Sequence, residues 1–207
     1  MSDPIADAIA AAQRGCLIVF PTDTVYGIGT RPDDAAATGR LFETKQRPRG
    51  LTLPVLAPST AVARRLARFD DRAERLALAL WPGAVTLVLP RSPVTADWDL
   101  GGDRDTIGLR VPDHAMALAV LAAGPLATTS ANRSGDPPAT TCDELESAFG
   151  GDVDVYLCAQ EPLVGAASTV VSVVGDLEVL RVGSIDPETI VRRSAGEGPL
   201  LDSGPPR

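Results

Sequence analysis

Short apolar segments alternate with capped helical segments along most of this chain, and this alternation limits the fold more than any other feature. Glycine, proline or aspartate bounds most of the apolar segments, as expected for buried strands. Some strands follow one another directly and others are separated by a helix. This mixture predicts an α/β fold with a mixed sheet and flanking helices.

The expected elements follow from apolar runs, helix caps and turn residues. We expect strands at 16–20, 51–57, 84–89, 106–111, 125–129, 153–158, 168–174 and 177–182. The last two form a hairpin through Gly175-Asp176. Helices are expected at 4–14, 59–68, 71–80 and 113–123, and others open at Asp33-Asp34, Thr141 and Asp186. Thr141 is followed three residues later by a glutamate, which predicts a capping box.

The chain is predicted to form a single domain. Its 207 residues, 44% of them hydrophobic, suffice to bury one full core. We find no internal repeat and no linker before residue 194. We therefore expect one domain over 1–193, followed over 194–207 by a disordered tail that contains glycine and proline.

Composition excludes several classes of protein. A net charge of −8 argues against a protein that binds nucleic acid with its whole surface. The arginines between 47 and 75 form either a local basic patch or the solvated sides of helices. A single histidine, His114, and three scattered cysteines exclude an ordinary zinc site. Such cysteines suit the reducing cytoplasm, and neither a signal peptide nor a membrane span is predicted.

The common catalytic motifs are missing. The chain has no P-loop and no Gly-x-Ser-x-Gly nucleophile turn. The segment Gly27-Ile28-Gly29 has Pro32 where a dinucleotide-binding loop has its third glycine. His114 follows Pro112-Asp113, which favours a surface position at a helix start over a role as a base.

One lysine, Lys45, stands against eighteen arginines. An ammonium is a compact point charge, whereas a guanidinium is a rigid planar fork, so the two are not interchangeable. The lone lysine in Lys45-Gln46-Arg47-Pro48 therefore indicates a position where a point charge reaches a phosphate or carboxylate. The alternative is a solvated helix end. Under either interpretation we expect a solvated side chain whose removal leaves the fold intact.

Hydroxyl side chains gather where predicted strands end. In open α/β sheets the ligand site lies beyond the carboxyl ends of the strands. Thr106 and Arg110, four apart on one strand, face the same side and offer a hydroxyl and a guanidinium to a carboxylate, or form an edge-strand ion pair. These residue types suit chemistry in which reactants are positioned and developing charge is neutralised. The clustered hydroxyl and amide residues are Thr22, Thr24, Thr128, Thr129, Ser130, Asn132, Ser134, Ser168 and Thr169.

Seven segments together resemble the YrdC/TsaC family of threonylcarbamoyl-AMP synthases, in family order and over roughly residues 5 to 190. The segments are Phe20 to Gly27, Lys45-Gln46-Arg47-Pro48, Trp81-Pro82-Gly83 with Thr86-Leu87, Thr106 to Pro112, Ser130 to Gly135, Ser168 to Val171 and Arg181 to Gly183. The resemblance implies a twisted mixed sheet, an open concave cleft lined with positive charge, and the short form without a second domain.

The implied activity is that of a nucleotidyltransferase. L-threonine, bicarbonate or CO2 and ATP yield L-threonylcarbamoyl-AMP and pyrophosphate. Partner proteins then transfer the threonylcarbamoyl group to tRNA, and weak tRNA binding is a further expectation. Mg2+ is expected with ATP, with phosphates and water as its main ligands, because no pair of carboxylates suggests a metal site.

The resemblance also implies roles for individual residues. For L-threonine, the implied contacts are Thr24, Thr128 and Ser168, with Arg110 on its carboxylate. For the nucleotide they are Thr106, Ser130, Asn132 and Arg181, with Lys45 and Arg47 on the phosphates as the catalytic pair.

Four residues depart from the family pattern: Leu51, Leu56, Pro138 and Ser172. The first two put the details of amino-acid recognition in question. They keep a YciO-like paralogue open as an alternative. An RNA-binding module is a second alternative, and the YrdC-like domain of hydrogenase-maturation carbamoyltransferases a third, although such domains sit within much larger chains.

Overall fold

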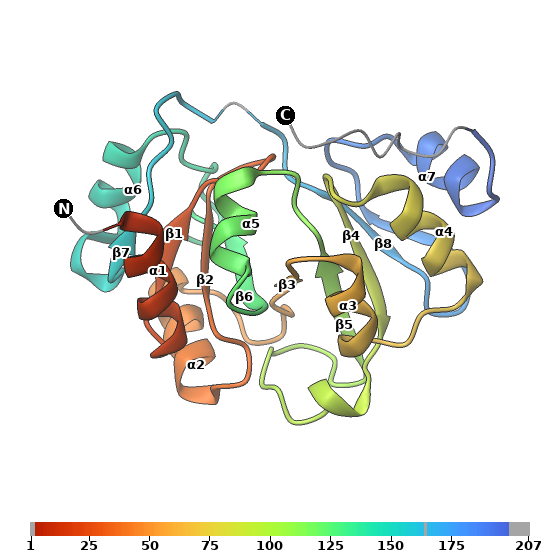
Figure 1. Cartoon of the computed structure of the whole chain (residues 1–207), viewed down its shortest axis with the longest axis horizontal. Helices are drawn as coiled ribbons and strands as arrows, with labels where there is room; N and C mark the ends of the chain where they lie inside the picture. The colour runs from red at the N-terminus through yellow and green to blue at the C-terminus, as the bar shows by residue number, and fades with distance from the viewer. Residues whose placement is uncertain (1–2, 164, 199–207) are drawn as a thin grey trace.

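The computed structural model describes residues 3–163 and 165–198. Their strands form one mixed sheet of nine strands in the order β7-β1-β2-β6-β3-β5-β4-β8-β9. In Figure 1, β1, β2 and β7 lie on the left, β4, β5 and β8 lie on the right, and β3 lies between them. The strands are β1 (Ile18–Phe20), β2 (Gly27–Thr30), β3 (Val55–Leu56), β4 (Val85–Pro90), β5 (Thr106–Arg110), β6 (Leu126–Ser130), β7 (Val155–Tyr156), β8 (Thr169–Ser172) and β9 (Glu178–Arg181).

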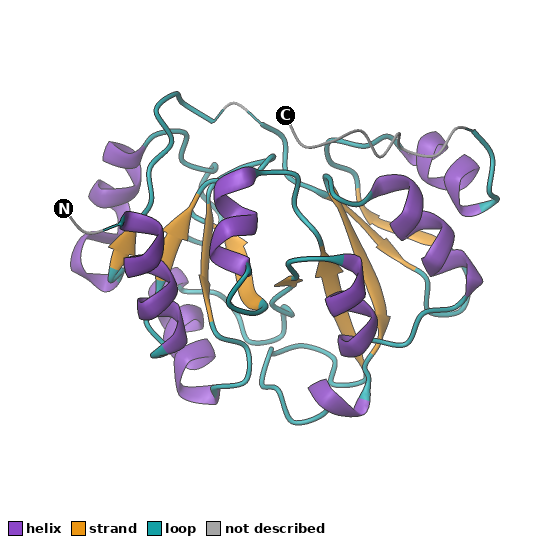
Figure 2. Cartoon of the chain, viewed as in Figure 1, coloured by secondary structure: helices purple, strands orange, loops and turns teal. Residues whose placement is uncertain are grey.

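Three of the strand pairs are parallel: β1 with β7, β3 with β5, and β4 with β8. The other five pairs are antiparallel, including the predicted hairpin of β8 and β9. The sheet is open, and helices flank it (Figure 2). This confirms the predicted α/β class with a mixed sheet.

Each helix begins at a residue that can cap it. Asp3 accepts the N–H of Ile5 at the start of α1, and Thr141 with Glu144 forms the predicted capping box of α6. Within the described ranges, no helix combines the length and apolar character needed to cross a membrane. The helices are α1 (Pro4–Gln13), α2 (Ala35–Lys45), α3 (Thr60–Leu66), α4 (Asp71–Leu80), α5 (Ala115–Leu121), α6 (Cys142–Phe149) and α7 (Pro187–Ser194), with 3-10 turns at Pro93–Thr95 and Gly150–Asp152.

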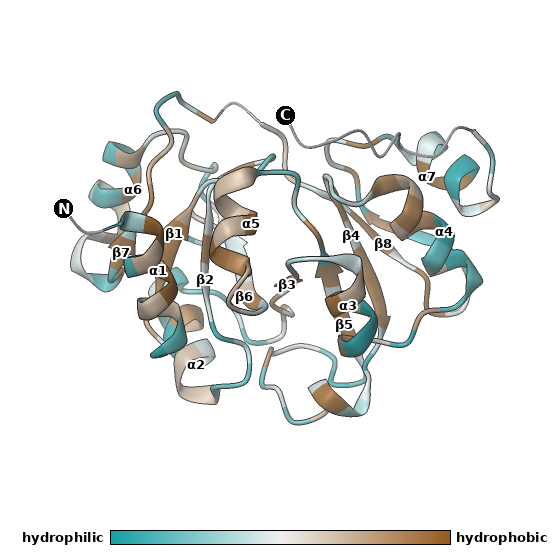
Figure 3. Cartoon of the chain, in the orientation of Figure 1, coloured by the Kyte–Doolittle hydropathy of each residue, from teal (hydrophilic) through white to brown (hydrophobic). Residues whose placement is uncertain are grey.

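Two groups of buried side chains hold the sheet and helices together. The smaller group joins α1 and α5 to β1, through residues such as Ala8, Phe20 and Leu121. The larger group extends from Leu17 to Ile190 and includes the inner sides of α2, α3 and α4. Figure 3 shows hydrophobic colour on β1, β4 and β8 and hydrophilic colour on parts of α3, α4 and α6.

Strand β2 was not among the predicted strands. Its sequence, Gly27 to Thr30, is poor in the residues that favour strands. The glycines are required because Thr128 of the neighbouring β6 occupies the space above them. A Cβ atom at Gly27 or Gly29 would lie 2.8 Å from the Thr128 side chain. The close approach of β6 therefore requires glycine in β2, although glycine does not favour a strand.

The predicted strand at 51–57 is shorter than expected. Only Val55 and Leu56 pair as β3. Pro54 has no N–H to donate, and its carbonyl instead accepts the N–H of Thr128 at 2.8 Å. Part of the predicted tail, 199–207, lies outside the described residues.

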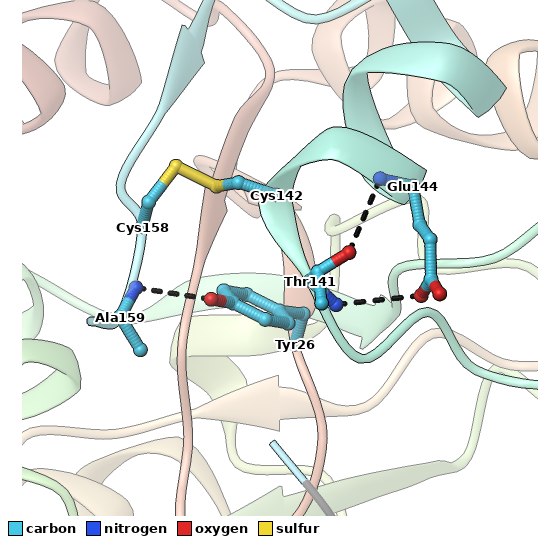
Figure 4. Close-up of a disulfide and its surroundings, with 6 residues drawn as sticks. All are labelled: Tyr26, Thr141, Cys142, Glu144, Cys158 and Ala159. Carbon is cyan, nitrogen blue, oxygen red and sulfur yellow. Dashed lines mark hydrogen bonds between the residues drawn. A yellow bond between two sulfur atoms is a disulfide. The ribbon is translucent and has the colours of Figure 1, made fainter. Parts of the chain in front are cut away.

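The structure contains a disulfide, although the three scattered cysteines suit a reducing cytoplasm. Cys142 and Cys158 form a disulfide, with their Cα atoms 5.7 Å apart, while Cys16 is free. The bond joins the first residue of α6 to the segment after β7 (Figure 4). A separation of 16 residues carries no pairing signal in the sequence, because only the folding of α6 beside β7 brings the two residues together.

Candidate active site

A cavity of about 470 Å³ lies along the sheet from the β1–β2 loop to β9. Its walls come from both halves of the sheet, so segments distant in sequence meet there. Lys45 and Asn132 are predicted site residues outside its lining, although both contact Ser130, which belongs to it. The predicted site residues that line the cavity are Thr24, Arg47, Thr106, Arg110, Thr128, Ser130, Ser168 and Arg181.

Arg110 is the most firmly held cation of the site, and only 5% of it is exposed. Its Nη2 pairs with Asp23 Oδ1 at 2.5 Å, its Nη1 donates to Thr24 Oγ1 at 2.9 Å, and its Nε donates to the Gly83 carbonyl at 2.9 Å. Burial lowers the pKa of Arg110, and Asp23 opposes that shift. These contacts fix the plane of the guanidinium before any ligand arrives.

Two further arginines face the cavity without a carboxylate partner. Arg181 donates to the Ser168 carbonyl at 2.8 Å and to its hydroxyl at 3.2 Å. Arg47 donates to the Thr52 carbonyl at 3.1 Å, while its buried Nε has no partner among the described residues. Burial lowers the pKa of both, and each is further lowered by a neighbouring arginine: Arg47 by Arg181, and Arg181 by Arg110.

Lys45 is not the solvated side chain that we expected. Only 2% of it is exposed, because its ammonium points inward from the last residue of α2. Nζ donates to the Ser130 carbonyl and, at 3.2 Å, to Asn132 Oδ1. Burial, and to a lesser degree the charge of Arg47, lowers the pKa of Lys45 to about 7.

Of the four basic side chains at the site, only Arg110 has a carboxylate partner among the described residues. Asp23 pairs with Arg110, and none of the ion pairs between described residues includes Lys45, Arg47 or Arg181. Like charges held this close, partly out of water, destabilise one another until an anion enters. The arrangement therefore favours a ligand with several negative charges.

Asn132 is held in one orientation. Its amide nitrogen donates to the carbonyls of Arg133 and Asp136, at 2.9 and 2.6 Å. Its oxygen therefore faces Lys45 and the Ser130 hydroxyl, which donates to it at 2.6 Å. The ammonium is thus kept beside the cavity wall at Ser130.

Part of the cavity wall is apolar. It is formed by residues of β4, β8 and β9. Leu51 and Leu56 also line the cavity, whereas Pro138 and Ser172 do not. Only the first two of the four departures from the family pattern can therefore touch a ligand in it. The apolar side chains of this part of the wall are Val88, Val170 and Leu180.

The site offers little for a metal ion. Among the described residues, no group of three or more His, Cys, Asp or Glu side chains could hold one. The carboxylate at the cavity, Asp23, is engaged by Arg110. A divalent cation held by the protein alone does not fit this donor set.

Several residues of the site were not predicted. Asp23 lies between Thr22 and Thr24 in a segment that we did single out, but its carboxylate acts through a partner 87 residues away. Thr86, which bonds the Ser168 hydroxyl at 3.0 Å, is likewise recognisable only once β4 and β8 are paired. His114 matches its prediction: it caps α5 and lies outside the cavity lining.

Tyr26 links the cavity to the disulfide region. Its ring lines the cavity, and its hydroxyl accepts the N–H of Ala159, next to Cys158, at 3.0 Å (Figure 4). The cavity wall and the covalent link are therefore neighbours.

Comparison with known proteins gives a consistent result. A sequence model of the Sua5/YciO/YrdC family, described as telomere recombination, matches residues 10–183. The threonylcarbamoyl-AMP synthase of Chromohalobacter salexigens is 38% identical over 72% of this chain and 82% of its own. Sua5 of Pyrococcus abyssi, solved in complex with L-threonine, aligns with a TM-score of 0.83 and 33% identity, covering 93% of this chain and 57% of that one. YciO of Escherichia coli aligns with a TM-score of 0.80 and 27% identity, covering 88% and 90%.

Proposed function

This chain belongs to the Sua5/YciO/YrdC family, and we propose that within it the protein is a threonylcarbamoyl-AMP synthase. It joins L-threonine, bicarbonate or CO2 and ATP, and releases L-threonylcarbamoyl-AMP and pyrophosphate. Relatives that bear the synthase name match the chain at 33–41% identity, and among solved structures Sua5 of Pyrococcus abyssi matches at 33%, against 27% for YciO. The observation in the structure that carries the proposal is a cavity lined by Arg47, Arg110 and Arg181, of which only Arg110 pairs with a carboxylate among the described residues.

The basic side chains of the cavity suit the two larger substrates. Arg110, already fixed by Asp23, offers a planar fork to the carboxylate of L-threonine. The charge of Arg181 lowers the pKa of Arg47, and neither arginine pairs with a carboxylate among the described residues, which supports a triphosphate as the anion that they bind. Lys45 joins them from behind Ser130. The predicted contacts of Thr106, Thr128, Ser168 and Asn132 remain part of this proposal.

Catalysis then rests on positioning and charge. Once the ammonium of L-threonine has lost a proton to solvent, its nitrogen attacks the carbon of CO2 and releases a second proton as the carbamate forms. With bicarbonate, the same step also expels hydroxide, which leaves with that proton as water. A carbamate oxygen then attacks the α-phosphorus of ATP as pyrophosphate leaves. Negative charge grows on the leaving pyrophosphate, next to the cations. Preformed charges in a partly desolvated site stabilise such a transition state without reorganising.

Three further expectations belong to the proposal. Mg2+ enters with ATP, held by phosphates and water, since the protein's own donor set does not fit it. Partner proteins take up the adenylate and carry the threonylcarbamoyl group to tRNA, with at most weak tRNA binding by this chain. The reaction takes place in the cytoplasm.

Product analysis tests the proposal. The purified protein, incubated with ATP, L-threonine and carbon-14 bicarbonate, should form a labelled nucleotide with the mass of threonylcarbamoyl-AMP. Omission of L-threonine should abolish the label. A folded protein that binds ATP but forms no labelled nucleotide would instead support a YciO-like paralogue.

A further inference from the structure

The hydroxyl protons at the Arg110 end of the cavity can be assigned one by one. Thr22 and Thr24 both line the cavity, and only 4% and 3% of them are exposed, so water does not compete for their bonds. Thr22 Oγ1 lies 2.6 Å from the Val25 carbonyl, which can only accept. The single proton of the Thr22 hydroxyl is therefore committed to Val25.

This assignment decides the direction of the next bond. Thr22 Oγ1 and Thr24 Oγ1 lie 3.0 Å apart, and either could donate on distance alone. Since the Thr22 proton is taken, Thr24 is the donor. Thr22 also accepts the backbone N–H of Thr24 at 3.2 Å, so both of its lone pairs are in use.

The Thr24 hydroxyl is left with one way to meet a ligand. Its proton points to Thr22, and one lone pair accepts from Arg110 Nη1 at 2.9 Å. One lone pair remains. Thr24 can therefore accept a hydrogen bond from a ligand but cannot donate one.

Arg110, in contrast, can only donate hydrogen bonds. A guanidinium has five N–H donors, and three are used by Gly83, Thr24 and Asp23. One N–H on each terminal nitrogen remains available. A pair of donors beside a single acceptor matches the carboxylate and amino group that every α-amino acid carries on one carbon.

We propose that Thr22 is a positioning residue that holds Thr24 as the acceptor for the amino group of the amino-acid substrate. The inference rests on the proposed function and adds an assignment to it. With one N–H of the substrate amine directed to Thr24, the nitrogen lone pair points away from the wall, toward the carbon that it attacks. Thr22 thereby orients the nucleophile without touching it.

The test compares L-threonine with 3-hydroxybutanoate, its analogue without the amino group. Binding of each to the wild type and to Thr22→Val is measured by calorimetry. In Thr22→Val the Thr24 proton loses its buried acceptor and is free to turn into the cavity. L-threonine binds with its amino group as an ammonium, so we expect it to bind at least about tenfold more weakly, the cost of one hydrogen bond to a charged group, while 3-hydroxybutanoate and ATP bind as before. The control variant Thr22→Ser keeps the hydroxyl and should bind L-threonine as tightly as the wild type does.

The possible results distinguish the proposed role of Thr22 from the proposed function of the protein. Equal losses for both ligands would show a merely structural role for Thr22 and overturn the inference, as would undiminished L-threonine binding by Thr22→Val. If Thr22→Val does not fold, Thr22→Ala decides: it removes the same hydroxyl without adding bulk and should weaken binding of L-threonine only. Failure of the wild type to bind L-threonine would overturn the proposed function itself, and this inference with it.

Discussion

Replacing Lys45 by methionine should change how the stability of the protein depends on pH. Lys45 is buried, and its pKa is lowered to about 7 from its ordinary 10.5. Between these values the unfolded chain holds a proton that the folded protein has released. Stability rises with pH wherever the unfolded state binds more protons. The wild type should therefore gain stability from pH 7 to pH 10, because the free energy that the unfolded chain gains by binding this proton decreases as the pH rises.

The magnitude follows from the two pKa values. Their difference, at about 1.4 kcal/mol per pKa unit, corresponds to about 5 kcal/mol over the full range. Folded Lys45 is half protonated at pH 7, and the unfolded side chain is still mostly protonated at pH 10. Between these two pH values we expect a gain of about 3 kcal/mol from this group.

Urea denaturation of the wild type and of Lys45→Met at pH 7 and pH 10 measures this gain. Other groups titrate equally in both proteins, so the difference between the two stabilities isolates Lys45. Lys45→Arg serves as a control, because a guanidinium stays protonated in both states. A difference between wild type and Lys45→Met that is the same at both pH values would refute the argument that Lys45 is desolvated and uncompensated.

Three further changes have defined outcomes. Arg110→Lys loses the planar fork and should raise the Michaelis constant for L-threonine at least tenfold while that for ATP stays the same; a parallel rise in both would contradict the assignment. Gly29→Ala would place a Cβ 2.8 Å from a side chain of β6 and should destabilise the protein by about 1–3 kcal/mol in urea, whereas Gly50→Ala, with nothing within 4 Å, should not. Reduction of the Cys142–Cys158 disulfide should cost about 3 kcal/mol in the same assay, and Cys142→Ser should be insensitive to reductant.

Local signals in the sequence were enough for most helices and strands. Asp3-Pro4, Ser59 and Thr141 with Glu144 begin helices where predicted, because a cap acts within one turn. The same reasoning missed β2, since a strand that contains two glycines is stabilised by the chain beside it. It also overextended β3, because Leu53 is buried like a strand residue but Pro54, which has no N–H, interrupts the pairing.

The sequence predicted many of the residues that form the site, but not which of them are buried or which residues they contact. Eight of the predicted residues line one cavity, but it lies over one face of the sheet rather than beyond the strand ends, because alternate residues of β5 (Thr106, Gly108 and Arg110) line it. The sequence could not show that Lys45 is buried, because α2 must first pack beside β6 for its ammonium to reach Ser130. Nor could it pair Asp23 with Arg110 or Cys142 with Cys158, since these contacts depend on the tertiary fold.

The most direct test of the account is pyrophosphate release from ATP by the purified protein, with each co-substrate omitted in turn. The account predicts release that requires both L-threonine and bicarbonate, and its loss in Lys45→Met under conditions where that variant is folded. Release that is independent of L-threonine, or no release by a folded protein that binds ATP, would contradict it.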